Sequence, residues 1–327
     1  MIGERKIKRI INQEFRKTLW YKNLWKGAEK FWANPPFDLD IINLGSGAAY
    51  FAYNYEGIDV KGCNWALWPQ SLQHDFNILK NYYSFIKPKG YVVITACPFG
   101  CLYSPNYDKN HNLKYYTFLH PATIQNFDED ERLKALLLKE NPLAYIGIKK
   151  VVKKIIKDKW VKPNHSITSE QYVDDAHSMI EGWKKQFGID DLDAPLSNKH
   201  KLEFDSRQKL LREMIQFCLE RDLRPVIVYP PIHPSLYALM SEKFIKRYIY
   251  DFIEGAISGL DCAFYEFLNS EKINSDDMFR TSYFLNTKGA KVFTSELIKL
   301  LRLLQCAENK HISSFLGGGK FIVVKKF

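Results

Sequence analysis

Residues 38–57 read DLDIINLGSGAAYFAYNYEG, and this stretch decides the fold. A short apolar run at residues 41–44 stops at a turn of small residues, Gly45-Ser46-Gly47. Such a run, cut off by glycine, is typical of a β-strand that ends in a tight corner. In an open α/β sheet the carboxyl ends of the strands are where ligands bind, so the turn is a candidate site.

The alternation of strand and helix continues along the chain. Residues 91–99 (YVVITACPF) and 223–231 (LRPVIVYPP) are near-continuous apolar runs, which is typical of strands buried on both faces. An amphipathic helix is expected over 206–222, and a final helix is expected from Thr287, the candidate N-cap. The expected strands lie at residues 40–44, 91–99, 223–231 and 261–269, and residues 61–71 are expected to hold a short second strand and a turn. The pattern predicts a three-layer α/β/α fold with a flavodoxin-like, doubly wound and mainly parallel sheet.

The α/β pattern covers residues 38–305. One segment precedes it, one interrupts it and one follows it. Residues 1–37 form a basic N-terminal segment with apolar positions at helical spacing over residues 4–32, which predicts a helix. Residues 102–203 are polar, aromatic and Lys-rich, and they predict a largely helical insertion after the third strand. Residues 306–327 form a tail in which Gly317–Gly319 predict a hinge before an edge strand.

Composition and charge narrow the class of protein. The chain has 327 residues, 46% of them hydrophobic, which is typical of a globular protein. Its net charge of +10 is concentrated in residues 4–30 and 147–164. The sequence contains neither an apolar run long enough to span a membrane nor a secretory signal, so we expect a cytoplasmic location. The basic runs match no nucleic-acid-binding motif, and no nucleic-acid partner is expected.

The basic N-terminal helix has three interpretations. It can pack on the domain with a solvated basic face, or it can contact a protein partner. It can also lie on an anionic membrane surface, which would make the protein peripheral at the inner face of the membrane.

Six cysteines are scattered along the chain, and several lie in apolar runs. Cys97 and Cys101 form one close pair, but no second pair at zinc-ligand spacing accompanies them. We therefore expect no metal and no cofactor.

Five segments occur in an order that resembles the SGNH/GDSL hydrolase superfamily, especially its branch found with bacterial surface-polysaccharide genes. The first segment spans the end of the first strand and the turn after it, and the last segment spans the expected start of the final helix. They are NLGSGA at residues 43–48, GCNWALWPQSLQHD at 62–75, ITACPF at 94–99, PVIVYPPIH at 225–233 and SYFLNTKGAKVFT at 282–294. The resemblance covers most of the chain outside the insertion and the first 35 residues.

The resemblance also assigns roles to positions, and the catalytic ones are substituted. The family's nucleophile falls on Gly47, its catalytic histidine on Phe284 and its orienting aspartate on Thr281. A phenylalanine cannot accept a proton, so these three positions cannot support serine chemistry. The oxyanion or ligand-binding groups implied by the family fall on Gly45, Gly47, Gly62 and Asn64, and Asn286 follows the base position.

Three hypotheses about function follow. The first is a degenerate member of the family that acts by binding a glycan or an acylated small molecule. The second is an active acyl-ester hydrolase or O-acyltransferase with Ser46 as nucleophile, His233 as base and Asp277 as orienting carboxylate, with Asp276 as the alternative. Ser46 can instead cap the next helix, and His233 can be a hydrogen-bonded loop residue. The third is a nucleotide- or S-adenosylmethionine-binding protein of Rossmann type, for which the turn supplies G-x-G without a third glycine.

Overall fold

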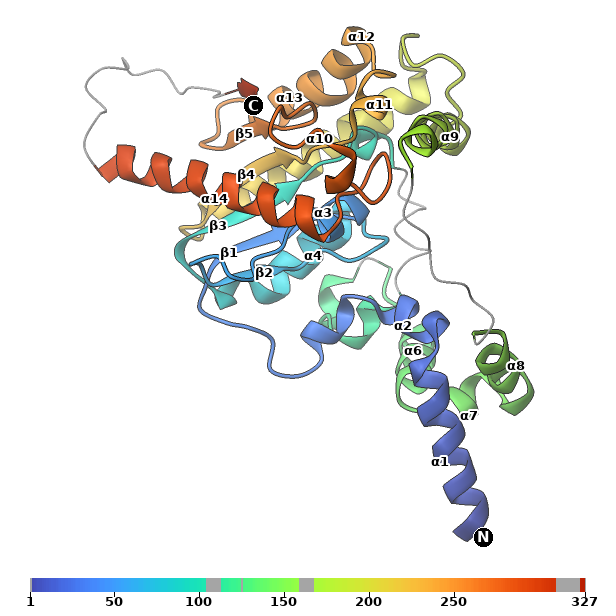
Figure 1. Ribbon diagram of the computed structural model, residues 1–327. Coiled ribbons are helices and arrows are strands. Elements are labelled where there is room, and N and C mark those ends of the chain that lie inside the picture. The colour runs from blue at the N-terminus through green and yellow to red at the C-terminus, as the bar shows by residue number, and fades with distance from the viewer. Residues whose placement is uncertain (1, 104–112, 125, 159–167, 310–323, 327) are drawn as a thin grey trace. The chain divides into compact units, whose positions relative to one another are not determined.

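The structure is a computed structural model that describes residues 2–103, 113–124, 126–158, 168–309 and 324–326 (Figure 1). The chain divides into two compact units, and each is described by itself. The sheet unit comprises Phe37–Phe76, Tyr82–Ser104 and Ser166–Phe327. The helical unit comprises Met1–Pro36, Asn77–Asn81 and Pro105–His165. The predicted insertion at 102–203 is therefore divided between the two units, and its first half belongs with the N-terminal segment.

The sheet unit is built on a parallel sheet of strand order β2-β1-β3-β4-β5-β6. The strands are β1 Leu39–Leu44, β2 Gly62–Asn64, β3 Ile86–Thr95, β4 Arg224–Tyr229, β5 Ala263–Glu266 and β6 Val324–Lys326. Every neighbouring pair runs parallel. This order confirms the predicted doubly wound α/β/α fold, and it places the topological switch point between β1 and β3. The corner after β1 lies at that point.

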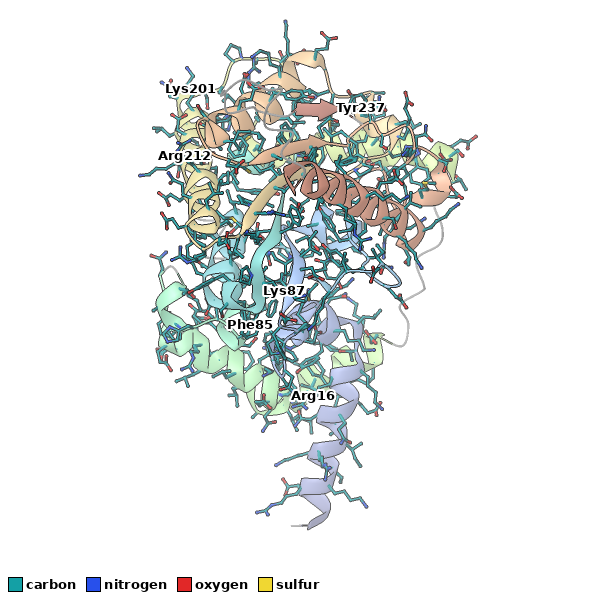
Figure 2. The ribbon with its side chains drawn as sticks, turned by 90° about the vertical axis from the view of Figure 1, so that its left-hand side faces the viewer. Arg16, Phe85, Lys87, Lys201, Arg212 and Tyr237 are labelled. Carbon is teal, nitrogen blue, oxygen red and sulfur yellow. The ribbon has the colours of Figure 1, made fainter. Side chains whose placement is uncertain are left out.

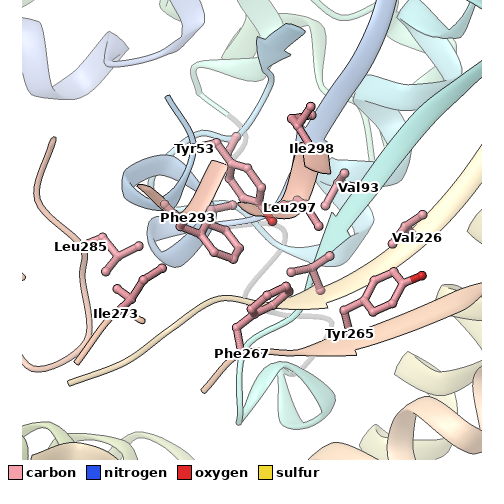
Figure 3. Packing of buried hydrophobic residues seen from close by; sticks show 14 of the residues in the cluster. Tyr53, Val93, Val226, Tyr265, Phe267, Ile273, Leu285, Phe293, Leu297 and Ile298 are labelled. Atoms are coloured by element: carbon pink, nitrogen blue, oxygen red, sulfur yellow. The ribbon is translucent and has the colours of Figure 1, made fainter. Parts of the chain in front are cut away.

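Helices cover both faces of the sheet. Phe293 and Leu297 of α14 join residues of α3 and of strands β1, β3, β4 and β5 in one buried cluster (Figure 3). On the other face α10 packs on β4 and α13, and Arg212 (Figure 2) donates hydrogen bonds to the carbonyls of Ala256 and Ser258. The helices of this unit are α3 Gly47–Ala52, α4 Leu72–Tyr82, α9 Ser169–Phe187, α10 Asn198–Leu219, α11 Pro234–Tyr237, α12 Glu242–Ile245, α13 Asp251–Ile257 and α14 Thr287–Asn309, with the short turns η2 Tyr83–Phe85, η3 Gly100–Leu102, η6 Lys246–Tyr250 and η7 Asp276–Met278.

The start of β3 differs from the prediction. The strand begins at Ile86 and not at residue 91, so it includes the Pro88-Lys89-Gly90 segment, whose proline and glycine are typical of a break between elements. The pairing with β1 shifts register here, and Lys89 adopts a φ of 61°. The break is accommodated as a bulge, because a bulge lets one strand carry extra residues without ending the pairing. Within this bulge the ammonium group of Lys87 (Figure 2) donates a hydrogen bond to the carboxylate of Asp40, with 2.8 Å between Nζ and Oδ1.

Two helix starts also differ from the prediction. Helix α10 begins at Asn198 and not at residue 206, because Ser197 caps it by accepting the N–H of His200. The cap of α14 is Asn286 and not Thr287, since the Asn286 side chain accepts the N–H groups of residues 288 and 289. At the tail β6 pairs with β5, and Gly317–Gly319 lie outside the described residues.

The helical unit is all-helical within the described residues. The predicted helix over residues 4–32 is three helices, because Thr18 caps a new helix and Gly27 takes a φ of 85°. The helices are α1 Ile2–Lys17, α2 Leu19–Trp25, η1 Ala28–Phe31, η4 Tyr115–Thr117, η5 Pro121–Thr123, α6 Glu129–Glu140, α7 Pro142–Ile146 and α8 Ile148–Asp158. Its core joins the first and last segments of the unit through Phe15, Tyr21, Trp25, Leu138, Leu143 and Val151. The N-terminal helix thus packs against α6–α8, which come from the first half of the predicted insertion.

Candidate functional site

The corner after β1 is tight and already hydrogen-bonded. Gly45 has a φ of 131°, and a Cβ atom on it would lie 2.7 Å from the Cβ of Ala49 and 3.0 Å from the Cβ of Thr95. Glycine is therefore required where the ends of β1 and β3 meet. The Gly45 N–H donates to the buried carboxylate of Asp75 at 2.7 Å. The expected use of this N–H as an oxyanion donor is thus wrong, because Asp75 accepts it.

Ser46 is the N-cap residue of α3, and its carbonyl accepts the Tyr50 N–H at 2.8 Å. Its hydroxyl oxygen accepts the backbone N–H of Gln70 at 3.1 Å, and its side chain makes no hydrogen bond to the first turn of α3. The cap interpretation is therefore confirmed for the position of Ser46, but its side chain does not make the capping bond. The hydroxyl instead fixes the loop that follows β2 to this corner.

Gly47 faces two aromatic rings. A Cβ atom on Gly47 would lie 3.0 Å from Cε1 of Phe284 and 3.1 Å from Cδ1 of Trp68. Gly47 is itself buried, so these rings cover the backbone that would carry a nucleophile in the family resembled. A side chain at position 47 would have to displace at least one of them.

The rings form a partly exposed aromatic cluster, here called the aromatic corner: Phe51, Trp68 and Phe284. Their centroids lie 5.0 Å apart for Phe51–Phe284 and 5.7 Å for each pair with Trp68. Trp68 is 45% exposed, and the guanidinium of Arg280 lies 5.2 Å from the Phe51 ring. Exposed aromatic rings stack on flat apolar surfaces of a ligand, and a cation beside them attracts the polar groups of the same ligand.

The other two expected oxyanion groups are structural. The Asn64 amide donates to the carbonyls of Ala49 and Tyr50, and its oxygen accepts from the Asn43 side chain at 2.8 Å. Gly62 lies at the start of β2, where a Cβ atom would come within 2.3 Å of the Tyr55 ring. Asn64 therefore ties α3 to β1 and β2, and Gly62 makes room for a tyrosine. Neither is placed as a donor to a ligand.

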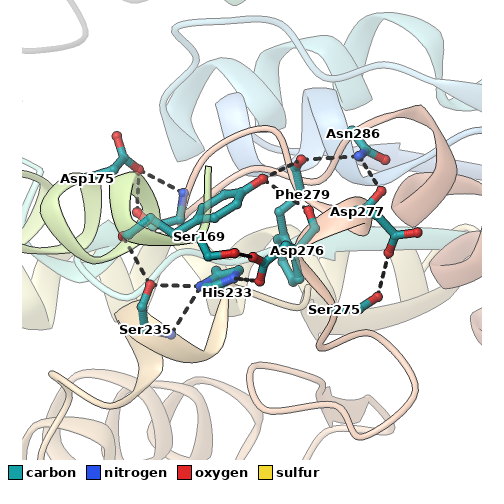
Figure 4. A network of polar contacts seen from close by, with 11 residues as sticks. Ser169, Asp175, His233, Ser235, Ser275, Asp276, Asp277, Phe279 and Asn286 are labelled. Atoms are coloured by element: carbon teal, nitrogen blue, oxygen red, sulfur yellow. Dashed lines mark hydrogen bonds and ion pairs between the residues drawn. The ribbon is translucent and has the colours of Figure 1, made fainter. Parts of the chain in front are cut away.

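His233 lies in a separate polar network after β4 (Figure 4). Its ring is buried, and Nε2 lies 3.0 Å from Oδ1 of Asp276. Nδ1 lies 2.8 Å from the hydroxyl of Ser235 and accepts the Ser235 N–H at 3.2 Å. Both ring nitrogens are thus hydrogen-bonded within this network, and Ser46 bonds elsewhere. The structure does not bring the predicted Ser46–His233 pair together.

The partner of His233 is Asp276, not the predicted Asp277. Asp276 also accepts the hydroxyl of Ser169, and these two bonds hold its carboxyl pKa below the usual value. Asp277 turns away to Lys288 and to Ser275, whose hydroxyl donates at 2.6 Å. The amide of Asn286 donates to the carbonyls of residues 277 and 279, so Asn286 shapes this loop.

Helix α9 also contacts this network, through Tyr172 and Asp175. The Tyr172 ring stacks on the His233 ring with centroids 4.2 Å apart, and its hydroxyl donates to the carbonyl of Phe279 at 2.9 Å. Asp175 accepts both the N–H and the hydroxyl of Ser282 (Figure 4). The β4–α11 loop, the loop after β5 and α9 are therefore fixed to one another by polar contacts.

Ser235, His233 and Asp276 have the connectivity of a catalytic triad. Because the Ser235 N–H donates to Nδ1, we assign the ring proton to Nε2, where it is donated to Asp276. The Ser235 hydroxyl has a second acceptor in the Tyr172 carbonyl at 3.1 Å. The arrangement can activate a serine, and it equally serves as a clamp that caps α11.

Cysteine chemistry at the switch point is unfavourable. Cys97 follows β3, and burial raises the pKa of its thiol to about 11. The nearby Asp75 carboxylate acts in the same direction. A thiol with this pKa is protonated at neutral pH and is a poor nucleophile. Over the described residues no group of three His, Cys, Asp or Glu side chains gathers in a way that could hold a metal ion.

Sequence reasoning missed the residues that organise both regions. Asp75 and Tyr172 received no role, and Phe51 and Trp68 were not connected with Phe284. The signal for Trp68 was its position inside the segment at 62–75 that carries the family resemblance. Phe51 and Tyr172 gave no comparable signal, because aromatic residues are frequent throughout the chain.

Comparison of the chain with protein-family models and with curated proteins finds no match. Within the described residues, no helix has both the length and the apolar character needed to cross a bilayer.

Proposed function

We propose that this chain is an SGNH/GDSL-like protein of bacterial surface-glycan biosynthesis that acts by binding and not by catalysis. One observation carries the proposal: the ring of Phe284 lies against the backbone of Gly47. These are the positions to which the family resemblance assigns the base and the nucleophile, which must touch each other in an active member. Their contact here supports the alignment of the two motifs, although the residues themselves cannot perform the chemistry.

The aromatic corner indicates the class of ligand. Phe51, Trp68 and Phe284 offer ring faces at the carboxyl end of β1, and Arg280 adds a positive charge. A sugar ring has an apolar face that stacks on aromatic rings and hydroxyl or acyl groups that accept hydrogen bonds. A glycan or an acylated small molecule therefore fits this corner. A phosphate cradle fits less well, because Asp75 already takes the Gly45 N–H and carries negative charge of its own.

The test of binding is calorimetric titration with an O-acetylated hexosamine tetrasaccharide and with its deacetylated form. We expect Trp68→Ala to reduce the affinity about tenfold or more, since it removes one ring of the stacking surface. Trp20→Ala is the matched control, because Trp20 is a similarly exposed tryptophan of the helical unit. Unchanged affinity in Trp68→Ala would overturn the proposed binding surface.

A catalytic alternative has one supporting observation, the Ser235–His233–Asp276 chain of contacts. In this alternative the Ser235 hydroxyl attacks an acyl ester and its proton passes to His233, which returns it to the alcohol as that leaves and the acyl-enzyme forms. Water or an acceptor hydroxyl then takes the acyl group and frees Ser235. Fluorophosphonate labelling and p-nitrophenyl acetate turnover distinguish the two proposals. We expect neither with the wild-type protein. Labelling that disappears in Ser235→Ala would establish the catalytic alternative, and labelling that disappears in Ser46→Ala would restore Ser46 as nucleophile.

The proposal includes a cytoplasmic location at the inner face of a membrane, with the N-terminal helix as the contact. Ile7 and Ile10 of α1 are exposed among Arg5, Lys8 and Arg9, which is the pattern of a helix that lies on an anionic surface. Sedimentation of the protein with anionic vesicles tests this location independently of the aromatic corner.

A further inference from the structure

Helix α8 divides its apolar residues between two environments. Val151 is fully buried, and Ile155 packs against the core of the helical unit. Ile148, Val152 and Ile156 form a second row at four-residue spacing, here called the exposed row, and they are 51%, 36% and 55% exposed. Val151 and Ile155 therefore attach α8 to the core of its unit. The exposed row has no hydrophobic cluster to join among the described residues.

Lysines border the exposed row. Lys149, Lys153 and Lys157 each follow a member of the row by one residue, so they form a parallel row beside it on the helix surface. The six side chains together line a shallow, mainly apolar groove. Lys150 and Lys154 add two further charges on the same helix. An exposed apolar row beside a row of lysines is the geometry of a helix that lies in a membrane interface.

The charge of the whole unit supports the same reading. The helical unit has 22 Lys and Arg residues against 10 Asp and Glu residues, whereas the sheet unit has 25 against 27. The excess positive charge of the protein therefore belongs entirely to the helical unit. A negatively charged leaflet attracts such a unit.

We propose that the exposed row of α8 binds the surface of a bilayer containing anionic lipids. Ile148, Val152 and Ile156 enter the boundary between headgroups and acyl chains, and the lysine row contacts lipid phosphates. Lysine stems can lie along the apolar surface while their ammonium groups reach the headgroups. This inference rests on the proposed membrane location but not on the proposed ligand at the aromatic corner. It assigns the main anchor to α8, where the sequence had pointed to α1.

A bilayer fits these observations better than a nucleic acid does. A nucleic acid would use the lysines but would leave three apolar side chains in water. A bilayer buries those side chains and neutralises the lysines in one contact. The two occupants therefore differ in whether the apolar row contributes to binding.

The experiment uses the full chain and sedimentation with vesicles of phosphatidylcholine alone or with 30 mol% phosphatidylglycerol (about the anionic content that gives a strong surface potential). We expect binding to the mixed vesicles only. The triple variant Ile148→Ser/Val152→Ser/Ile156→Ser should lose affinity about tenfold or more, because it removes the buried apolar area. Lys149→Glu/Lys153→Glu/Lys157→Glu should lose at least as much, and salt should weaken binding of the wild-type protein.

Leu133→Ser/Leu137→Ser is the matched control. These leucines of α6 are 54% and 42% exposed at the same four-residue spacing, and three acidic residues occupy the first turn of their helix. We expect this variant to bind as the wild type does. Circular dichroism of each variant confirms that its helical content is unchanged, as expected for exposed positions.

The remaining outcomes separate the hypotheses. Loss of binding in the lysine variant alone would show attraction to anions without apolar insertion, and it would overturn the proposal. Loss in Ile7→Ser/Ile10→Ser with full binding by the α8 variants would place the anchor on α1, which refutes the α8 inference but keeps the membrane location. Absence of wild-type binding to either vesicle would overturn both. None of these results changes the test of the aromatic corner.

Discussion

The sheet unit buries a cluster that spans four strands and three helices, whereas the helical unit closes a small cluster and leaves apolar rows of α1 and α8 exposed. The candidate ligand-binding residues of the sheet unit gather at the carboxyl edge of a fixed sheet. Those of the helical unit are spread along the outer faces of helices. The difference separates two ways of binding: a shaped corner that selects a small molecule, and a charged apolar surface that adheres to an extended one.

The largest expected effect tests whether the two units have separate cores. Phe293→Ala removes a fully buried ring that contacts Tyr53 and Phe267, so it should lower the free energy of unfolding by about 3 to 5 kcal/mol. Urea denaturation measures this loss. Hydrogen exchange of the α1 amides should stay unchanged if the cores are separate.

Phe37→Ala serves as the control for this prediction, because Phe37 is largely exposed and its removal should cost less than about 1 kcal/mol. Equal loss of protection in α1 and in β4 would contradict the division into two cores.

A buried lysine distinguishes the helical unit further. Lys114 is buried, and burial lowers the pKa of its ammonium group to about 7. The unfolded chain holds this proton up to about pH 10.4, so the unit should become more stable as pH rises from 7 toward 10. Lys114→Met should stabilise the protein by about 2 kcal/mol at pH 7 and remove this pH dependence.

Thermal melting at pH 7 and pH 9.5 measures the effect of Lys114→Met. Lys22→Met, at an exposed lysine of α2, is the control and should change neither the stability nor its pH dependence. A steeper rise of stability with pH in Lys114→Met than in the wild type would show that the sign of the prediction is wrong.

Substitution of Gly47 tests how closed the aromatic corner is. Gly47→Ser places a side chain against Phe284 and Trp68 and should cost about 1 to 2 kcal/mol through overpacking. Part of this cost should disappear in Gly47→Ser/Phe284→Ala, because the second substitution removes the ring that the new side chain meets. A double-mutant cycle in urea measures the coupling. Strict additivity would mean that the two positions do not share space.

The smallest effect concerns the His233 network. Asp276→Asn should cost about 1 kcal/mol at pH 7, because it replaces a charged acceptor of two hydrogen bonds with a neutral one. The pKa of Asp276 is lowered in the folded state, so its contribution is present above the unfolded value near pH 4 and is lost as pH falls below it. The melting difference between wild type and variant should therefore shrink below about pH 4.

Asp277→Asn is the matched control, since Asp277 contacts Lys288 and Ser275 and not His233. A larger loss in Asp277→Asn than in Asp276→Asn would contradict the network as described.

Strands β1, β3, β4 and β5 were predictable because each contains a local apolar run with its own boundary signals, whereas β2 is only Gly62–Asn64. The first strand, its Gly-Ser-Gly corner and the strand at β4 follow from neighbours in sequence. The bulge at the start of β3 was not predictable, because Pro88 and Gly90 signal a break and only the pairing with β1 converts it into a bulge.

The candidate site was less predictable, because its contacts join distant residues. Ser46 is held by Gln70, and Asp75 reaches back 30 residues to Gly45. Asp276 and Asp277 are adjacent and chemically identical, and the turn η7 alone decides which one faces His233. Sequence patterns report period and composition, but they do not report which side of a loop a carboxylate takes.

The helical unit is assembled from segments that lie far apart in the sequence, and this has a consequence for how the chain folds during synthesis. Arg16 donates to the carbonyl of Lys139, a residue 123 positions later. At about 5 to 20 residues per second, α1 waits for roughly 6 to 25 seconds before the ribosome delivers its partner helices. During that interval Phe15 can contact Trp20 and Tyr21, but its partners in the cluster from α6, α7 and α8 do not yet exist. Helix α1 therefore exists for some seconds as a basic amphipathic helix that is only partly covered, and a chaperone or a membrane surface can meet it before its core is complete.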